Sequence, residues 1–197
     1  ITPYYKIKLF TGELWCLILK EQDWKSYGLS IMIFSLASML FTYTLLRIQA
    51  FLPLNPQNFA NLPEHLAFNT AGSFTTNTNW QSYGGESTMS YFSQMVALTF
   101  HNFASAALGI SVAAVLVRGI AGDRIKGLGN FWADMVRIQL YLLLPLSIVF
   151  AIFLVSQGMI QNFMPYTAAT WLDTAPEGLA QQLIAQGPVA SQVAIKM

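Results

Sequence analysis

Three long apolar segments divide this chain, and each is long enough to cross a lipid bilayer as a helix. Residues 28–46, 89–117 and 138–155 contain no Asp, Glu, Lys or Arg. A membrane-spanning helix needs about 20 mostly apolar residues. We therefore predict an all-α membrane protein with spans at these three positions, and Pro145 is expected to kink the third span.

The segment between the first two spans has an unusual order of apolar and polar residues. Asn61 is predicted to cap a short, weakly apolar helix at about residues 62–74, which is followed by the polar run 76–79 and a pair of glycines. This order is typical of a re-entrant pore helix and filter loop. Non-helical backbone at membrane depth is tolerated only where it is buried in protein or lines a water-filled cavity, so a functional reason is expected.

The residues Thr76, Asn77, Thr78 and Asn79 suit the coordination of potassium. Potassium sheds water only where several oxygens replace its hydration shell, and backbone carbonyls can do so together with hydroxyl or amide groups. No Asp and Glu cluster is present that could hold calcium or magnesium. One strand cannot surround an ion, so four such loops are required. The alternative is an ordinary surface turn, because Asn and Ser are common turn formers.

The positions of Lys and Arg predict the orientation of the chain in the membrane. Four of the ten lie before the first span and four lie between the second and third spans. The positive-inside rule then puts residues 1–25 and 118–137 in the cytoplasm and the filter on the outer side.

The order of span, outer loop and short helix starts again after residue 138, which suggests two span–pore-loop–span repeats, the second incomplete. We expect residues 1–25 to be a cytoplasmic or interfacial lead-in, 26–117 the first repeat, 118–137 a cytoplasmic connector and 138–197 the start of a second repeat. Within the last part, an outer loop precedes the start of a pore helix at about 187–197. The chain lacks an initiator Met and a signal peptide, so we expect it to be a piece of a longer protein.

Composition supports the membrane class and excludes others. The chain is 54% hydrophobic and 10% charged with a mean hydropathy of +0.47, whereas soluble domains have roughly 25% charged residues. The net charge is +1 and Lys and Arg do not cluster, so the sequence does not show the basic surface that is typical of proteins that bind nucleic acid. The single cysteine, Cys16, is interpreted as a small apolar residue. His101 is expected to bind a protein group, and no transition-metal site is expected because no second histidine has ligand spacing.

Six stretches carry a resemblance to a known family: Leu52–Pro56, Asn69–Tyr83, Gly85–Gln94, Leu128–Asn130, Gln161–Pro165 and Gly187–Gln192. They resemble the potassium-transporting A subunit of the bacterial Kdp P-type ATPase, the KdpA family. The resemblance runs from about Trp24 to Met197 and concerns the N-terminal part of the family's longer protein.

The resemblance implies a potassium-binding and translocating, channel-like subunit of an ATP-driven, high-affinity potassium uptake complex. It implies that Thr76–Asn79 form part of the filter, that Gln81 sits at the filter entrance, and that the ion is potassium. The implied partners are membrane lipid and the subunits KdpB, KdpC and KdpF in the bacterial plasma (inner) membrane. ATP would be hydrolysed by KdpB, so this chain is not expected to be an enzyme by itself.

Two other functions remain open from the sequence. The first is a secondary potassium transporter or channel of the same superfamily. The second is a membrane enzyme or assembly scaffold that uses His65, Glu86 and His101. We disfavour the second because these residues share no recognisable acid-base or metal-ligand spacing.

Overall fold

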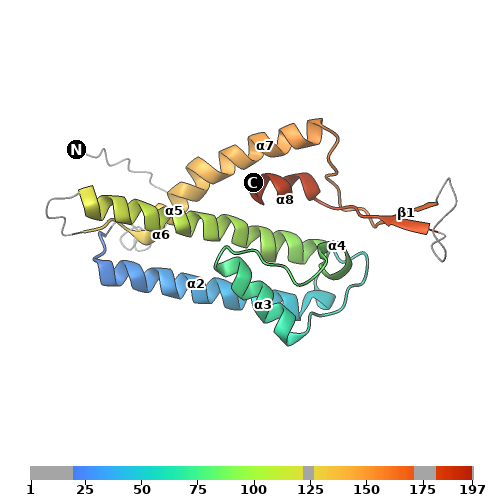
Figure 1. The fold of residues 1–197 in the computed structure, drawn as a ribbon, viewed down its shortest axis with the longest axis horizontal. Coiled ribbons are helices and arrows are strands. Elements are labelled where there is room, and N and C mark those ends of the chain that lie inside the picture. Colours follow the sequence, from blue (N-terminus) through green and yellow to red (C-terminus); the bar gives the residue numbers. More distant parts are fainter. Residues whose placement is uncertain (1–19, 122–126, 171–180, 197) are drawn as a thin grey trace.

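The computed structural model describes residues 20–121, 127–170 and 181–196. Its centre is an antiparallel pair of long helices (Figure 1): α2 (Trp24–Arg47) lies beside a continuous helix made of the π segment η2 (Ser93–Thr99) and α5 (Phe100–Ala121). Tyr27 Oη donates to the Ser111 carbonyl at 3.4 Å near one end of the pair. The rings of Phe41 and Phe100 lie 5.8 Å apart further along.

A third long helix consists of α6 (Phe131–Ile138), the π segment η3 (Gln139–Leu143) and α7 (Leu144–Ser156). Helix α6 packs against α2 and α5, whereas α7 leans away from α5 and the short helix α8 (Val189–Lys196) lies between them (Figure 1). The η3 segment ends two residues before Pro145, which lacks an amide donor for the preceding turn. The regular α-helical bonding pattern is therefore interrupted where the sequence predicts a kink.

Within the described residues, three helical stretches are long and apolar enough to cross a membrane. They are Trp24–Arg47, Ser93–Ala121 and Phe131–Ser156. The third stretch begins inside the predicted connector. Apolar side chains of α7 stay exposed, such as Val149 at 68%, as expected where lipid replaces water. The prediction of an all-α membrane fold is confirmed at this level.

The segment between the first two long helices contains the 3₁₀ turn η1 (Gln49–Phe51), helix α3 (Glu64–Thr75) and the single-turn helix α4 (Gly85–Thr88). The capping position of α3 is Pro63, whose side chain makes no capping bond. Asn61 Oδ1 instead accepts a hydrogen bond from the Ala50 amide at 2.9 Å. The predicted capping role of Asn61 is therefore wrong, because the turn after α2 uses its side chain.

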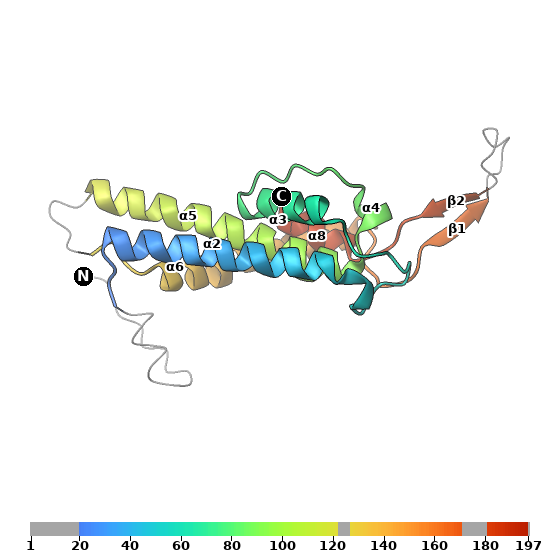
Figure 2. The same cartoon turned by 90° about the horizontal axis from the view of Figure 1, so that it is seen from below.

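A two-stranded hairpin follows α7, and the sequence analysis does not predict it. Strand β1 (Thr167–Thr170) pairs antiparallel with β2 (Gln181–Ile184), with Thr167 opposite Ile184. Figure 2 shows the hairpin projecting beyond the helices at the end that carries α4. Cys16 and most of the predicted lead-in at 1–25 lie outside the described residues.

At the opposite end of the bundle, a bidentate ion pair joins α5 to α6. Arg118 Nη1 and Nη2 lie 2.6 and 2.9 Å from the carboxylate oxygens of Asp134. Tyr27 Oη of α2 donates to the same carboxylate at 3.1 Å. Only 7% of the Asp134 side chain is exposed, whereas 39% of the Arg118 side chain is. The three long helices are thus tied together at the end that the charge pattern predicts to be cytoplasmic.

Candidate ion-binding site

Arg47 fastens the start of α3 to the end of α2. Its Nη1 donates to the Leu62 carbonyl at 2.5 Å, and its Nη2 lies 3.3 Å from Oε1 of Glu64. The Leu62 amide donates to the Leu46 carbonyl at 3.2 Å. Glu64 also lies in the first turn of α3, where the helix dipole favours a carboxylate. Helix α3 therefore leaves the end of α2 in a fixed direction.

Gln49, which the sequence analysis did not single out, ties three segments together. Its side chain is fully buried, and its Nε2 donates to the carbonyls of Ala60 and Thr88 at 2.6 and 2.8 Å. Its Oε1 accepts from the Ser90 amide at 3.2 Å and from Ser93 Oγ at 2.9 Å. An amide satisfied on both sides inside the protein is a rigid anchor. Gln49 thus fixes both ends of the segment that contains α3.

The C-terminal end of α3 lies beside the middle of the two long helices. A Cβ atom built on Gly72 would be 4.0 Å from Cε of Met39 in α2. Asn77, just beyond α3, accepts a hydrogen bond from Ser105 Oγ in α5 at 3.2 Å. Met39 and Ser105 are interior residues of two of the membrane-length helices. The chain therefore runs from one end of the helix pair to its middle and then returns to α4.

After α3 the chain folds back, and successive amides point into the last turn of the helix. The Asn77 amide donates to the Phe74 carbonyl at 3.2 Å. The amides of Thr78 and Asn79 donate to the Ser73 carbonyl at 3.0 and 3.4 Å. These bonds satisfy carbonyls that the end of a helix otherwise leaves without partners. The segment is therefore bound to α3 through its N–H groups.

The carbonyl groups of the same segment are free. Within the described part of the chain, the main-chain oxygens of Thr76, Asn77, Thr78 and Asn79 accept no hydrogen bond. Asn77 and Asn79 have left-handed backbone, with φ of 57° and 54°, so the segment is not a regular β-strand. Free carbonyl oxygens beside the negative end of a helix dipole form an electronegative surface. Such a surface favours a cation.

The two threonine hydroxyls are bound within the turn. Thr76 Oγ1 donates to the Gly72 carbonyl at 3.0 Å, and Thr78 Oγ1 donates to the Ser73 carbonyl at 3.1 Å. The two hydroxyl oxygens are 3.2 Å apart. Their hydrogens are therefore used inside the loop, which keeps the threonine side chains close to the end of α3.

The two asparagine side chains differ in their partners. Asn77 Oδ1 accepts hydrogen bonds from Asn79 Nδ2 at 3.4 Å and from Ser105 Oγ at 3.2 Å. Asn79 Oδ1 is buried and has no hydrogen-bond partner among the described residues. Asn77 thus supports the loop, whereas the buried Asn79 Oδ1 makes no hydrogen bond to the described residues.

Gln81 lies one residue beyond Trp80, and both side chains are exposed. The Gln81 side chain makes no hydrogen bond to the described residues. Further along the loop, burial raises the pKa of Tyr83 well above its usual value, so its hydroxyl stays protonated. The loop beside the free carbonyls is thus uncharged from Thr76 to Gly85.

The residues named for an enzyme or scaffold are not brought together. His101 is buried on α5, with Nε2 at 3.0 Å from the Ser38 carbonyl of α2, so the expected protein partner is present. His65 on α3 and Glu86 on α4 are exposed. In the ranges that the structure describes, no three His, Cys, Asp or Glu residues gather into a group that could hold a metal ion.

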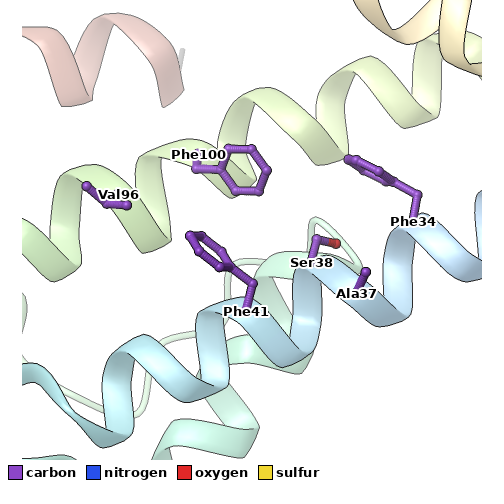
Figure 3. Close-up of a pocket in the computed structure, with 6 residues that line it drawn as sticks. All are labelled: Phe34, Ala37, Ser38, Phe41, Val96 and Phe100. Atoms are coloured by element: carbon purple, nitrogen blue, oxygen red, sulfur yellow. The ribbon is translucent and has the colours of Figure 1, made fainter. Parts of the chain in front are cut away.

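A separate cavity of about 510 Å³ lies between α2 and the η2–α5 helix (Figure 3). It is lined by Phe34, Ala37, Ser38, Phe41, Val96 and Phe100. The aromatic rings of Phe41 and Phe100 meet edge to face there, with an interplanar angle of 72° (Figure 3). An apolar cavity cannot replace the hydration shell of a cation, so this cavity is not the ion site.

Proteins similar to this chain carry the name of one subunit of a potassium-transporting ATPase. A family model described as the potassium-transporting ATPase A subunit, KdpA, matches residues 14–197. The chain is 56% identical over 177 residues to the "Potassium-transporting ATPase potassium-binding subunit" of Solibacter usitatus. The aligned region covers 90% of this chain and 30% of the relative.

Two further relatives carry the same name. The protein of Methylorubrum extorquens is 56% identical over 178 residues, which are 90% of this chain and 30% of the relative. That of Acidobacterium capsulatum is 53% identical over 191 residues, with 90% of this chain and 32% of the relative covered. The chain thus spans about a third of the length of the curated relatives that it matches.

Proposed function

Because this chain belongs to the KdpA family of potassium-transporting ATPase A subunits, we propose that it binds and conducts potassium as part of an ATP-driven uptake complex. The observation that carries this proposal is the arrangement of residues 76–79. Their N–H groups donate to carbonyls in the last turn of α3, and their four carbonyl oxygens accept no hydrogen bond from the described residues. This polarity is what a dehydrated cation requires.

In this proposal, Thr76–Asn79 form one part of a potassium filter and α3 is its pore helix. The carbonyl oxygens replace water around the ion, and the Asn79 side-chain oxygen is a further ligand candidate because it has no partner among the described residues. Gln81 stands at the filter entrance. The remaining filter loops come from the rest of a longer chain, and α8 is the start of the second pore helix.

The membrane arrangement follows from the charge distribution. The protein lies in the bacterial plasma (inner) membrane, with residues 1–25 and 118–137 in the cytoplasm and the filter facing the outside. The course of α3 supports this arrangement, since its end lies beside the middle of the helix pair, next to Met39 and Ser105.

The partners in this proposal are KdpB, KdpC and KdpF, and KdpB hydrolyses the ATP. The scattered positions of His65, Glu86 and His101 support a non-catalytic role for the part of the chain described here. A secondary potassium transporter would have the same filter. Co-purification of the full-length protein with a potassium-stimulated ATPase distinguishes the pump from such a transporter.

The experiment is a potassium titration of ATP hydrolysis by the full-length complex, comparing wild type with Gln81→Arg. A positive charge at the filter entrance repels the incoming ion, so we expect the half-saturating potassium concentration to rise at least tenfold, which corresponds to about 1.4 kcal/mol, while the maximal rate is retained. Asn79→Asp alters the charge beside the ion and is expected to change the same parameter.

Gln157→Arg is the matched control, because Gln157 is exposed and makes no side-chain hydrogen bond to the described residues. It adds the same charge away from the loop and should leave the potassium dependence unchanged. If Gln81→Arg and Asn79→Asp also leave it unchanged, residues 76–79 are only a surface turn and the proposed site is wrong.

A further inference from the structure

Ser73, in the last turn of α3, has its side chain inside the turn formed by residues 76–80. Its Oγ accepts a hydrogen bond from the Trp80 amide at 2.7 Å. The same oxygen lies 3.2 Å from Oγ1 of Thr78. The Ser73 carbonyl already accepts the amides of Thr78 and Asn79, so this one residue holds three successive N–H groups.

Each of these amides fixes the carbonyl of the residue before it. In a planar trans peptide, the N–H and C=O groups point in opposite directions. An N–H held toward α3 therefore turns the preceding carbonyl away from α3. The amides of Asn77, Thr78 and Asn79 are held by main-chain carbonyls of Phe74 and Ser73, and they orient the oxygens of Thr76, Asn77 and Thr78.

The fourth carbonyl, that of Asn79, depends on a side chain. Its orientation is set by the Trp80 amide, which donates to Ser73 Oγ. The amides that orient the other three carbonyls donate to main-chain oxygens. Only for the Asn79 carbonyl, among these four, can a side-chain substitution remove the acceptor that holds the adjacent amide. Neither the residue pattern nor the family match assigns a role to Ser73.

We infer that Ser73 is a positioning residue of the ion site, whose hydroxyl fixes the Asn79–Trp80 peptide so that the Asn79 carbonyl faces the potassium ion. The inference rests on the proposed function of residues 76–79. Without the hydroxyl, the Trp80 amide loses its acceptor among the described residues and the peptide can rotate, which removes or displaces one oxygen from the coordination shell. Selectivity depends on the number and placement of such oxygens.

The test is the potassium titration of ATP hydrolysis by the full-length complex, repeated with sodium and rubidium. For Ser73→Ala we expect the half-saturating potassium concentration to rise about tenfold and discrimination against sodium to fall, with the maximal rate retained. Ser73→Thr keeps the hydroxyl and should behave as wild type. Ser82→Ala removes a hydroxyl in the same loop whose one acceptor among the described residues is Asn69 Oδ1, at 3.3 Å, and should also behave as wild type.

The outcomes separate the inference from the proposed function. If wild type responds to potassium and Ser73→Ala matches Ser82→Ala in affinity and ion discrimination, the role of Ser73 is refuted. If wild type itself shows no potassium dependence, the proposed function fails. If Ser73→Ala does not assemble, Ser73→Cys decides, because a thiol is a weaker acceptor of similar size. A wild-type affinity in the Cys variant also refutes the inference.

Discussion

At the scale of single residues, the backbone of the loop after α3 depends on asparagine in two ways. Asn77 has a φ of 57°, a conformation that Asn tolerates better than most residues because its short polar side chain can bond locally. Its Oδ1 is bound by both Asn79 and Ser105. Asn77 therefore combines a left-handed backbone with a tie to α5.

These two contributions can be separated by substitution. Asn77→Gly removes the side-chain bonds but accepts a positive φ at no steric cost, whereas Asn77→Ala loses the bonds and also strains the backbone. We expect Asn77→Ala to be less stable than Asn77→Gly by about 1 kcal/mol. Thermal unfolding of the full-length protein with and without potassium measures the difference. Equal melting temperatures would mean that the left-handed conformation of Asn77 is not kept.

The polar residues of the site could be selected from the sequence, but their supports could not. Thr76–Asn79 stand out as a polar run between membrane-length segments. The role of Ser73 depends on the chain folding back so that Trp80 meets the end of α3. Gln49 is similar, because its partners Ala60, Thr88 and Ser93 come together only in the folded chain. Hydrophobic pattern and turn signals carry no information about such contacts.

At the scale of elements, the helices follow from length and apolar content, whereas irregular elements do not. The η2 and η3 segments lie in stretches where apolar residues occur on every face, so a change of helical period leaves no trace in the pattern. The β1 sequence Thr-Ala-Ala-Thr and the β2 sequence Gln-Gln-Leu-Ile lack the alternation of a half-buried strand.

The ion pair between α5 and α6 gives a prediction about helix packing. Asp134→Ala leaves the Arg118 guanidinium without its carboxylate and removes the nearer of the two acceptors of Tyr27 Oη, the other being the Ser111 carbonyl. Because Arg118 is partly exposed, we expect a loss of about 2–3 kcal/mol, below that of a fully buried pair. Unfolding of the full-length protein in detergent measures it.

Arg137→Ala is the control for this prediction. Arg137 is exposed on the same helix run and makes no ion pair in the described part of the chain. It should unfold as wild type does. If the Asp134→Ala variant is as stable as Arg137→Ala, the Arg118–Asp134 ion pair does not hold α5 and α6 together.

At the scale of the whole molecule, the loop after α7 joins the second part of the chain to the first. Tyr91 Oη donates to the Met164 carbonyl at 2.8 Å, and Tyr166 Oη donates to the Glu86 carbonyl at 2.7 Å. Burial, with nearby Tyr91 and Glu86, raises the pKa of Tyr166 to about 12. Its hydroxyl thus remains a donor at physiological pH.

Gly187 completes this junction just before α8. Its φ is +131°, and a Cβ atom there would lie 2.9 Å from Cε1 of Tyr91, so only glycine permits this approach. The residue that precedes helix α8 by two positions is therefore held against Tyr91, close to the start of the second long helix.

The central claim is that the carbonyl oxygens of Thr76–Asn79 bind the transported ion. Its most direct test is anomalous scattering from crystals of the full-length protein soaked in rubidium, which substitutes for potassium. We predict an anomalous peak within coordination distance of these carbonyls, and its loss when excess potassium is added. A peak elsewhere, or none beside residues 76–79 in protein that still responds to potassium, would contradict the claim.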